Sequence, residues 1–256
     1  MMERQNIKCL IVPDVHGRVF WKEPVNRVLG AGNGPVIFLG DYVDPYLHEW
    51  YDSAENVRRK AIEELKSIIA LKKLYPKNVI LLLGNHDCTY MIGKDICECR
   101  TDYENFNEIK EIFHNNRSLF QLAYELRTDG RHFIFSHAGI RREYAVSCFG
   151  DEVNEDNVVS LFNNAFTEDK TEVMNSLGIY SRYRGWSPFD YGSIVWADAR
   201  EWAFNKPDET FGYNVVGHTM LMRPYIGEYM AFIDTQEVYA IDNSANIVKY
   251  NDLQEK

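Results

Sequence analysis

The chain has 256 residues, which is enough for one large domain with a substantial hydrophobic core. Hydrophobic residues make up 45% and charged residues 26% of the chain, as in an ordinary globular protein. The net charge of -10 argues against a general nucleic-acid-binding surface, although bound metals could still attract a small phosphorylated substrate by reversing the local charge.

The five cysteines follow neither a disulfide pattern nor a zinc-binding pattern. Their number is odd, and Cys97-Glu98-Cys99 lacks both the two-residue gap of common zinc motifs and a second matching pair. We expect reduced thiols. The first apolar run is too short for a signal peptide, and no stretch approaches a membrane span. The expectation is a cytoplasmic protein with no membrane partner.

The first predicted strand is Ile7–Val12, and Asp14 and His16 follow it closely. Pro13 biases the residue before it toward an extended conformation, so the strand should run into this pair. Residues two apart on an extended segment project to the same side, so Asp14 and His16 can hold one ion together. Alone, such a pair is more often a surface turn, but its position after a buried strand favours a metal site.

A helix is predicted from about Phe20 to Leu29, and the second strand at Pro35–Leu39 leads into Asp41 and Asp44. In open α/β sheets, sites form beyond the carboxyl ends of the strands. Two aspartates on a turn with no cation nearby in sequence are costly to bury, and a divalent cation would compensate them. Asp41 is therefore a candidate metal ligand.

Asp52 and Glu55 predict a capping box, from which apolar residues at helical spacing continue to about Tyr75. That helix would return the chain to the sheet as in a β-α-β unit. The third strand, Asn78–Leu83, ends in the polar segment 84–87. Three successive strand ends with residues of ligand type indicate one shared site.

Parts of 103–113 and 119–126 are predicted to be helical. His132–Phe135 reads as a strand that leads to His137, and residues from about 141 to 200 read as an inserted, mostly helical segment.

A fifth strand end carries His218 after Val215 and Val216. Short apolar runs at 231–234, 238–241 and 247–250 predict an antiparallel meander packed on the main sheet.

The five strand ends carry, in order, Asp-x-His-Gly, Gly-Asp-x-x-Asp, Gly-Asn-His-Asp, Ser-His-Ala-Gly and Gly-His-Thr. This ordered set resembles the calcineurin-like metallophosphoesterase superfamily, and in particular its phosphoprotein-phosphatase (serine/threonine phosphatase-like) branch of bacterial type. The resemblance covers residues 11–44, 79–87, 133–140 and 214–219. It implies an α/β (α+β) fold: a four-layer β-sandwich flanked by helices, as a single domain over residues 1–256 with the insertion at about 141–200.

The resemblance also implies a metal-binding role for six residues. Asp14 and His16 would hold the first ion, Asp41 would bridge both ions, and the second would be completed by Asn85, His137 and His218. Imidazole, carboxylate and amide ligands together suit Mn, Fe or Zn better than Ca or Mg alone. We expect two divalent metal ions, with Mn as the first choice and Fe, Zn, Co or Ni as alternatives.

Two cations about 3.5–4 Å apart can hold a bridging water as hydroxide for in-line attack on phosphorus. His86 resembles the family's general acid, which protonates the leaving alkoxide. Asp44 resembles the carboxylate that orients this histidine and stabilises its charged form. Considered alone, His86 is more simply a histidine packed at a strand end, but the surrounding motifs favour catalysis.

The sequence departs from the branch after Asp44, where an arginine that grips the phosphate is usual and Pro45 and Tyr46 stand instead. Proline cannot supply a bidentate phosphate clamp. The candidate replacements are Arg182, Arg184 and Arg200. For each of the three, a solvated surface role is an equal alternative.

Two further departures concern Asp87 and Pro13. The eukaryotic phosphatases carry Glu at the position of Asp87, which points to the bacterial side of the group. Pro13 replaces the usual Gly or Ser and should be tolerated, because only the backbone matters there.

The expected function is metal-dependent phosphoester hydrolysis, with a protein-phosphatase-like phosphomonoesterase as the leading form. The missing arginine leaves a phosphodiesterase or a dinucleoside-polyphosphate hydrolase as the alternative. A non-catalytic binding scaffold is disfavoured, because every expected ligand position is retained together with His86 and Asp44. The expected partner is a phosphorylated substrate, which could be a phosphoprotein, a nucleotide or a small phosphoester.

Overall fold

The computed structural model describes residues 7–93, 99–128, 130–203 and 210–253. Two mixed β-sheets pack against each other at its centre. The strand order is β11-β10-β1-β2-β3-β4 in the first sheet and β5-β6-β7-β9-β8 in the second. The chain therefore passes repeatedly between sheet and surface helices, as the sequence predicts.

In the first sheet, four parallel strands are extended on one side by an antiparallel hairpin. The parallel strands are β1 (Ile7–Val12), β2 (Val36–Phe38), β3 (Val79–Leu82) and β4 (Phe120–Gln121). The hairpin strands are β10 (Tyr239–Asp242) and β11 (Ile247–Lys249).

In the second sheet, three parallel strands lie between two antiparallel edge strands. The parallel strands are β6 (Arg131–Ser136), β7 (Tyr213–Val216) and β9 (Met230–Phe232). The edge strands are β5 (Ala123–Thr128) and β8 (Tyr225–Ile226).

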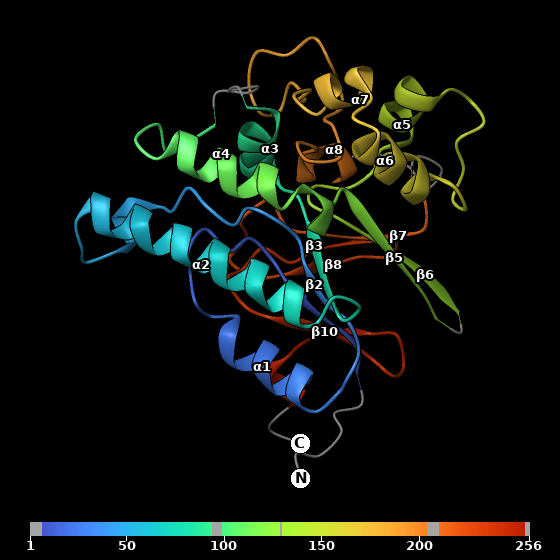
Figure 1. Ribbon diagram of the computed structural model, residues 1–256. Coiled ribbons are helices and arrows are strands. Elements are labelled where there is room, and N and C mark those ends of the chain that lie inside the picture. Colours follow the sequence, from blue (N-terminus) through green and yellow to red (C-terminus); the bar gives the residue numbers. More distant parts are fainter. Residues whose placement is uncertain (1–6, 94–98, 129, 204–209, 254–256) are drawn as a thin grey trace.

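The residues of strand β1 are apolar on both faces because both faces are buried. Cys9 and Ile11 pack against the second sheet, whereas Leu10 and Val12 pack against the helices. Such burial on both faces is typical of parallel strands covered by helices. Helices α1 (Lys22–Gly30) and α2 (Ala54–Leu74) cover the outer face of the first sheet (Figure 1).

The outer face of the second sheet packs on α8 (Ala199–Ala203). Val216 and Phe232 of this face contact Trp202 in a small apolar cluster. Helix, sheet, sheet and helix thus form four layers, which confirms the predicted sandwich.

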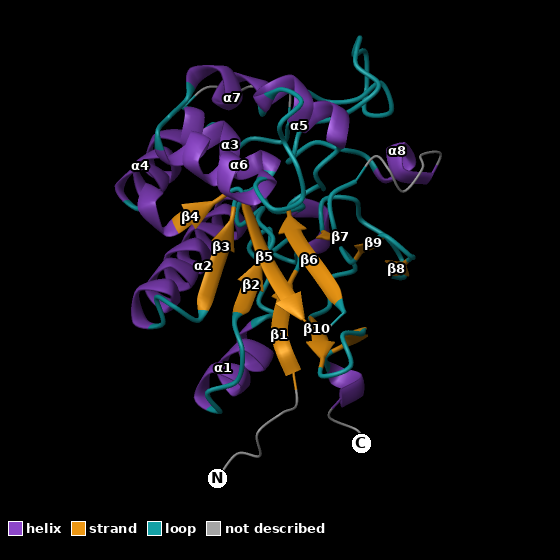
Figure 2. Cartoon of the chain, turned by 90° about the vertical axis from the view of Figure 1, so that its right-hand side faces the viewer, coloured by secondary structure: helices purple, strands orange, loops and turns teal. Residues whose placement is uncertain are grey.

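The remaining helices gather over the end of the sheets toward which β2, β3 and β6 point (Figure 2). They are α3 (Asn85–Ile92), α4 (Phe106–Asn115), α5 (Arg142–Phe149), α6 (Val158–Thr167) and α7 (Thr171–Ser176). Short 3-10 helices lie at Leu47–Glu49, Arg117–Leu119 and Asn251–Leu253. Side chains that follow the parallel strands are therefore covered by helices and loops rather than left in open solvent.

Three local predictions were wrong. Within 119–126, residues 120–121 form β4 and residues from 123 onward form β5 instead of a helix, because β5 pairs along its whole length with the next strand, β6, in a hairpin, and this pairing overrides local preference. The α2 cap is Ser53, whose Oγ accepts the Asn56 N–H at 3.2 Å, so the predicted capping box at Asp52 is one residue too early.

The third wrong prediction concerns the C-terminal strands. Of the three strands predicted to form a meander, β10 and β11 pair antiparallel on the first sheet, whereas β9 joins the second sheet parallel to β7. Within the predicted insertion, the helices α5, α6 and α7 occupy the first half, and residues 178–198 run through turns and bends.

Cys9, Cys99 and Cys148 are free thiols, while Cys97 and Glu98 lie outside the described residues. Among the helices that the structure describes, none is long and apolar enough to cross a membrane.

Candidate metal centre

Side chains that follow strands of both sheets converge on Asp41. Its Oδ2 lies 3.5 Å from His16 Nε2, which follows β1, and 3.5 Å from His137 Nε2, which follows β6. Two groups of potential metal ligands result, each with its ligand atoms within 4.8 Å of one another. The groups are His16, Asp41 and His86, and Asp41, His137 and His218. Asp41 belongs to both, as a bridging ligand would.

Asn85 and Asp14 complete this cluster. His137 Nε2 lies 2.9 Å from Asn85 Oδ1 and 3.0 Å from His218 Nδ1. Asp14 Oδ1 accepts the backbone N–H of His218 at 2.9 Å and lies 4.0 Å from His137 Nδ1. The structure therefore brings together all six residues for which the sequence predicts a metal-binding role.

The backbone at the strand ends is unusual. His16, Asp41, Asp44 and His218 have φ values of 45°, 53°, 56° and 62°, in the left-handed region that side chains disfavour. Each such residue costs on the order of 1 kcal/mol or more and persists only where its surroundings hold it. Four such residues in three neighbouring turns are typical of a functional site.

Glycines permit the close approach of these turns. A Cβ on Gly84 would lie 2.1 Å from Asp41 Oδ1, and a Cβ on Gly217 would lie 2.1 Å from Asp14 Oδ1. Any larger residue at either position would displace a carboxylate of the cluster. The glycines before Asn85 and His218 are therefore part of the site's construction.

The Asp87 side chain connects the turn at Asp41 with the turn at Gly84. Its Oδ2 accepts the N–H groups of Asp41 at 2.7 Å and Gly84 at 2.8 Å, and its Oδ1 accepts that of Tyr42 at 3.0 Å. Burial raises the pKa of Asp87 to about 6, against the effect of these backbone donors. The carboxyl group thus positions the Asp41 turn against the start of α3.

Backbone carbonyls set the orientation of two histidine rings. His16 Nδ1 lies 2.8 Å from Val43 O, and His137 Nδ1 lies 2.9 Å from Leu39 O. A carbonyl only accepts, so Nδ1 carries the hydrogen in both rings and the Nε2 lone pair faces Asp41. Metal-binding histidines are commonly oriented in this way.

The electrostatics of the cluster call for a cation. Burial raises the pKa of Asp41 well above its usual range and lowers the pKa of His16 and His218 well below theirs. The buried Nε2 of His218 has no hydrogen-bond partner among the described residues. Neutral imidazoles around buried carboxyl groups are a donor set suited to divalent Mn, Fe or Zn. The residues fit a metal centre.

His86 lies next to this centre and is held by Asp44. Its Nδ1 is 2.8 Å from Asp44 Oδ2, and Asp44 Oδ1 accepts hydrogen bonds from the Tyr90 hydroxyl and from the Asp102 N–H at 3.0 Å. Burial alone would lower the pKa of His86, but the Asp41 and Asp44 carboxylates raise it. The arrangement stabilises a protonated ring that can give up a proton.

Of the three arginines predicted to bind substrate, only Arg184 lies beside the centre. Its Nη2 donates to Thr219 Oγ1 at 2.9 Å, next to His218, and its Nε lies 2.8 Å from Asp198 Oδ2. Arg200 instead binds Asp198 at 2.7 Å. Arg182, with 60% of its side chain exposed, pairs with Asp190 at 3.1 Å. Among the described residues, neither contacts a predicted ligand.

The profile of the calcineurin-like phosphoesterase family matches residues 7–222 of this chain. The chain belongs to that family. It is a metal-dependent phosphoesterase, in agreement with the ligand groups at the strand ends.

Solved structures support the fold. A mutant cold-active protein tyrosine phosphatase aligns with 95% of this chain and 80% of its own, at 14% identity and a TM-score of 0.51. A serine/threonine phosphatase from Saccharomyces cerevisiae with similarity to human PP5 aligns with 93% of this chain and 73% of its own, at 15% identity and a TM-score of 0.51. These likenesses show a shared architecture.

Asp234 is a residue of the enzyme's site that sequence reasoning missed. It follows β9, and the pairing of Val216 with Phe232 places it in register with His218. Burial, aided by the charge of Asp14, raises the pKa of Asp234 to about 9. The sequence does carry a signal for Asp234, an aspartate at the end of an apolar run, as at Asp41. The predicted meander, however, places this strand on the first sheet, whereas β9 belongs to the second.

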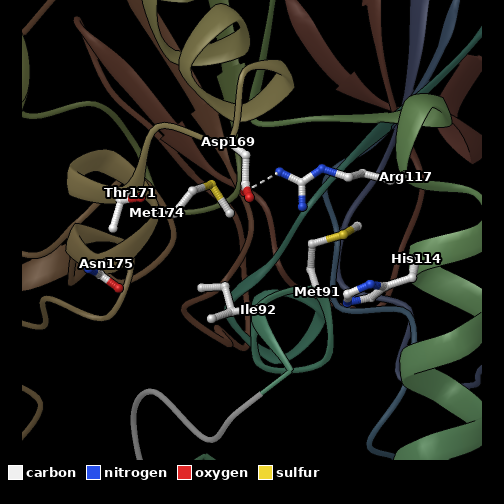
Figure 3. A pocket seen from close by; sticks show the side chains of 8 residues that line it. All are labelled: Met91, Ile92, His114, Arg117, Asp169, Thr171, Met174 and Asn175. Carbon is white, nitrogen blue, oxygen red and sulfur yellow. Dashed lines mark hydrogen bonds and ion pairs between the residues drawn. The ribbon is translucent and has the colours of Figure 1, made fainter.

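The enzyme also has a cavity of about 230 Å³ at the far end of α3 (Figure 3). Met91 and Ile92 line it from α3, with Met174 and Asn175 from α7. Arg117 on its wall donates to Asp169 Oδ1 at 2.9 Å, so its charge is already neutralised. None of the predicted metal ligands lines this cavity, which is therefore separate from the strand-end site.

Proposed function

We propose that the protein is a dinuclear metal-dependent phosphomonoesterase of the phosphoprotein-phosphatase type. The observation that carries the proposal is the shared position of Asp41 in two ligand groups, one of which includes His86, whose Nδ1 is bound to Asp44. The proposed ligands are Asp14, His16 and Asp41 for one ion and Asp41, Asn85, His137 and His218 for the other. Asp87, in place of the Glu of eukaryotic phosphatases, supports a place among the bacterial relatives of that branch.

Two divalent ions at these ligands would activate a water molecule and neutralise charge on the phosphoryl oxygens. The His-rich donor set supports Mn, with Fe, Zn, Co or Ni as alternatives. The residues around the ligands pre-organise them, since Asp87 fixes the Asp41 turn and carbonyls fix His16 and His137. Little reorganisation of the protein would be needed when the ions bind.

His86 is the proposed general acid. Because its Nδ1 is bound to Asp44, the other ring nitrogen is the one that can donate a proton to the leaving oxygen. Asp44 in turn is held by Tyr90 and the Asp102 N–H, so the histidine has a fixed direction. Arg184 is the proposed phosphate-binding residue, because it donates to Thr219, next to the predicted ligand His218.

The decisive experiment is a His86→Ala substitution in metal-reconstituted protein. Loss of a general acid should lower kcat by about 10²–10⁴-fold for an alkyl phosphomonoester such as phosphoserine, with metal content unchanged. The loss should be much smaller for p-nitrophenyl phosphate, because its leaving group needs less help from a proton.

The matched control is His132→Ala. His132 also contacts carboxylates, Glu125 at 2.6 Å and Glu155 at 2.7 Å, but it is the second residue of β6, at the opposite end of this strand from His137. This variant should keep full activity. An equal loss for both leaving groups in the His86 variant would contradict the general-acid role.

Pro45, standing where an arginine is usual, favours a phosphodiesterase or dinucleoside-polyphosphate hydrolase as the second candidate. Turnover of p-nitrophenyl phosphate and bis-p-nitrophenyl phosphate, both with Mn, separates the two readings. The phosphomonoesterase proposal predicts the higher kcat/KM for the monoester. A wild-type protein that hydrolyses no phosphoester with Mn, Fe, Zn, Co or Ni would instead be a binding scaffold.

A further inference from the structure

Three arginines place positive charge near the histidines of the metal centre: Arg18, Arg100 and Arg184. Two of them are neutralised. Arg18 donates to both carboxylate oxygens of Glu49, at 2.9 and 3.0 Å, and Arg184 lies 2.8 Å from Asp198. Arg100 forms no ion pair with any residue that the structure describes. Of the three, it is the cation for which the described part of the chain supplies no counter-charge.

Arg100 is nevertheless held in place, by neutral groups. Its Nε and Nη2 donate to the backbone oxygen of Asp44 at 3.1 and 2.7 Å. Its guanidinium lies over the ring of Tyr46, 3.6 Å from the ring centre. Two residues further along, Asp102 N–H donates to the Asp44 side chain at 3.0 Å. Arg100 is exposed to solvent, but these contacts give its guanidinium a fixed orientation.

This fixed position faces the metal centre. Tyr46, beneath the guanidinium, meets the His16 ring edge-on with 5.1 Å between ring centres. Asp44, which accepts from Arg100 through its backbone, holds His86 through its side chain. The Nη1 of Arg100 has no hydrogen bond within the described part of the chain and remains available to an anion.

Stacking on an aromatic ring without a carboxylate partner is not by itself evidence for a binding role. Arg131 lies over Tyr213 at 4.6 Å and forms no ion pair among the described residues. It begins β6, at the opposite end of this strand from the metal centre. What distinguishes Arg100 is an unneutralised charge beside a metal centre. Holding the Asp44 carbonyl needs only a neutral donor, so that role leaves the charge unexplained.

We propose that Arg100 binds the phosphoryl group of the substrate and favours the dianion of a phosphomonoester over the monoanion of a diester. The inference rests on the proposed phosphoesterase function and names a substrate-binding residue for it. Pro45 and Tyr46 follow Asp44 directly, where an arginine that binds phosphate is usual in the related phosphatases. Arg100 would supply this positive charge from a different segment of the chain, stacked on Tyr46. Guanidinium groups suit phosphate because their donors match two oxygens at once.

The test compares Arg100→Ala with the matched control Arg131→Ala, both reconstituted with Mn. Inorganic phosphate binding is measured by isothermal titration calorimetry, which does not depend on turnover. Losing a charge-assisted hydrogen bond should weaken phosphate binding by about tenfold or more in Arg100→Ala. The control should bind phosphate like the wild type. Arg100→Lys should recover part of the affinity, since it keeps the charge but not the planar donors.

Kinetics supply the second readout. In Arg100→Ala, kcat/KM should fall by about tenfold for p-nitrophenyl phosphate and by less than about threefold for bis-p-nitrophenyl phosphate, which carries one charge less. Unchanged phosphate affinity, an equal fall for both esters, or loss of metal from the variant would overturn the proposal. If the wild type hydrolyses no phosphoester, the proposed function fails, while the phosphate titration still decides the role of Arg100.

Discussion

The turns that carry the predicted metal ligands and the segments that carry the arginines are built in opposite ways. The ligand turns are buried, and backbone contacts such as those of Asp87 and Gly84 fix them. Arg182 and Arg184 lie on an irregular, more exposed segment, where ion pairs with Asp190 and Asp198 hold them. The fold thus dictates where metal would bind, whereas the shape of the proposed phosphate-binding surface depends on a few ion pairs between side chains.

Substitution of Asp41 should have the largest effect, because this residue belongs to both ligand groups. In Asp41→Asn we expect loss of bound metal and a fall in kcat well beyond the roughly 10–100-fold typical of outer-shell changes. Metal analysis after dialysis, alongside p-nitrophenyl phosphate turnover, measures both.

The stability of metal-free Asp41→Asn provides the control. Burial disfavours the charged form of Asp41, so removing that charge should leave the metal-free protein at least as resistant to urea as the metal-free wild type. Retention of two metal ions per chain would show that Asp41 is not the shared ligand.

Asp87→Asn tests how far the conformation of the ligand turns depends on the hydrogen bonds that their backbone N–H groups donate to Asp87. An amide keeps one acceptor oxygen but points its NH₂ at a backbone N–H, so at least one of the three hydrogen bonds is lost. We expect a decrease of about 3 kcal/mol in the free energy of unfolding, together with weaker metal binding. Urea unfolding in the presence of a chelator separates the first effect from the second.

Asp190→Asn is the comparison for this variant, because Asp190 is an exposed carboxylate that pairs only with Arg182 among the described residues. It should change stability by less than about 0.5 kcal/mol. Similar values for the two variants would mean that the strand-end turns hold their shape without Asp87.

The same contrast explains what the sequence could reveal. Asp14, Asp41, Asn85 and His137 each follow a buried apolar run, and the ends of parallel strands meet at one edge, so their meeting was predictable. The position of Arg100 beside Asp44 was not predictable, because Arg100 lies 56 residues further along the chain, in a loop without hydrophobic periodicity. Strand pairing also decided the cases that went wrong. The residues of β5 suggest a helix but pair with the adjacent β6, and Asp234 follows β9, which joins the second sheet beside β7.

Arg184→Ala should have the smallest effect, because it removes a cation while leaving the metal ligands in place. Arg184 is partly buried and donates to Thr219, so its loss should raise KM for a phosphomonoester by about tenfold with little change in metal content. Arg182→Ala should be indistinguishable from the wild type, since that side chain is exposed and pairs with Asp190. If the two variants raised KM equally, the effect would come from net charge rather than contact. If Arg184→Ala released metal, the phosphate-binding segment would be coupled to the ligand turns after all, through the neighbouring residues Thr219 and His218.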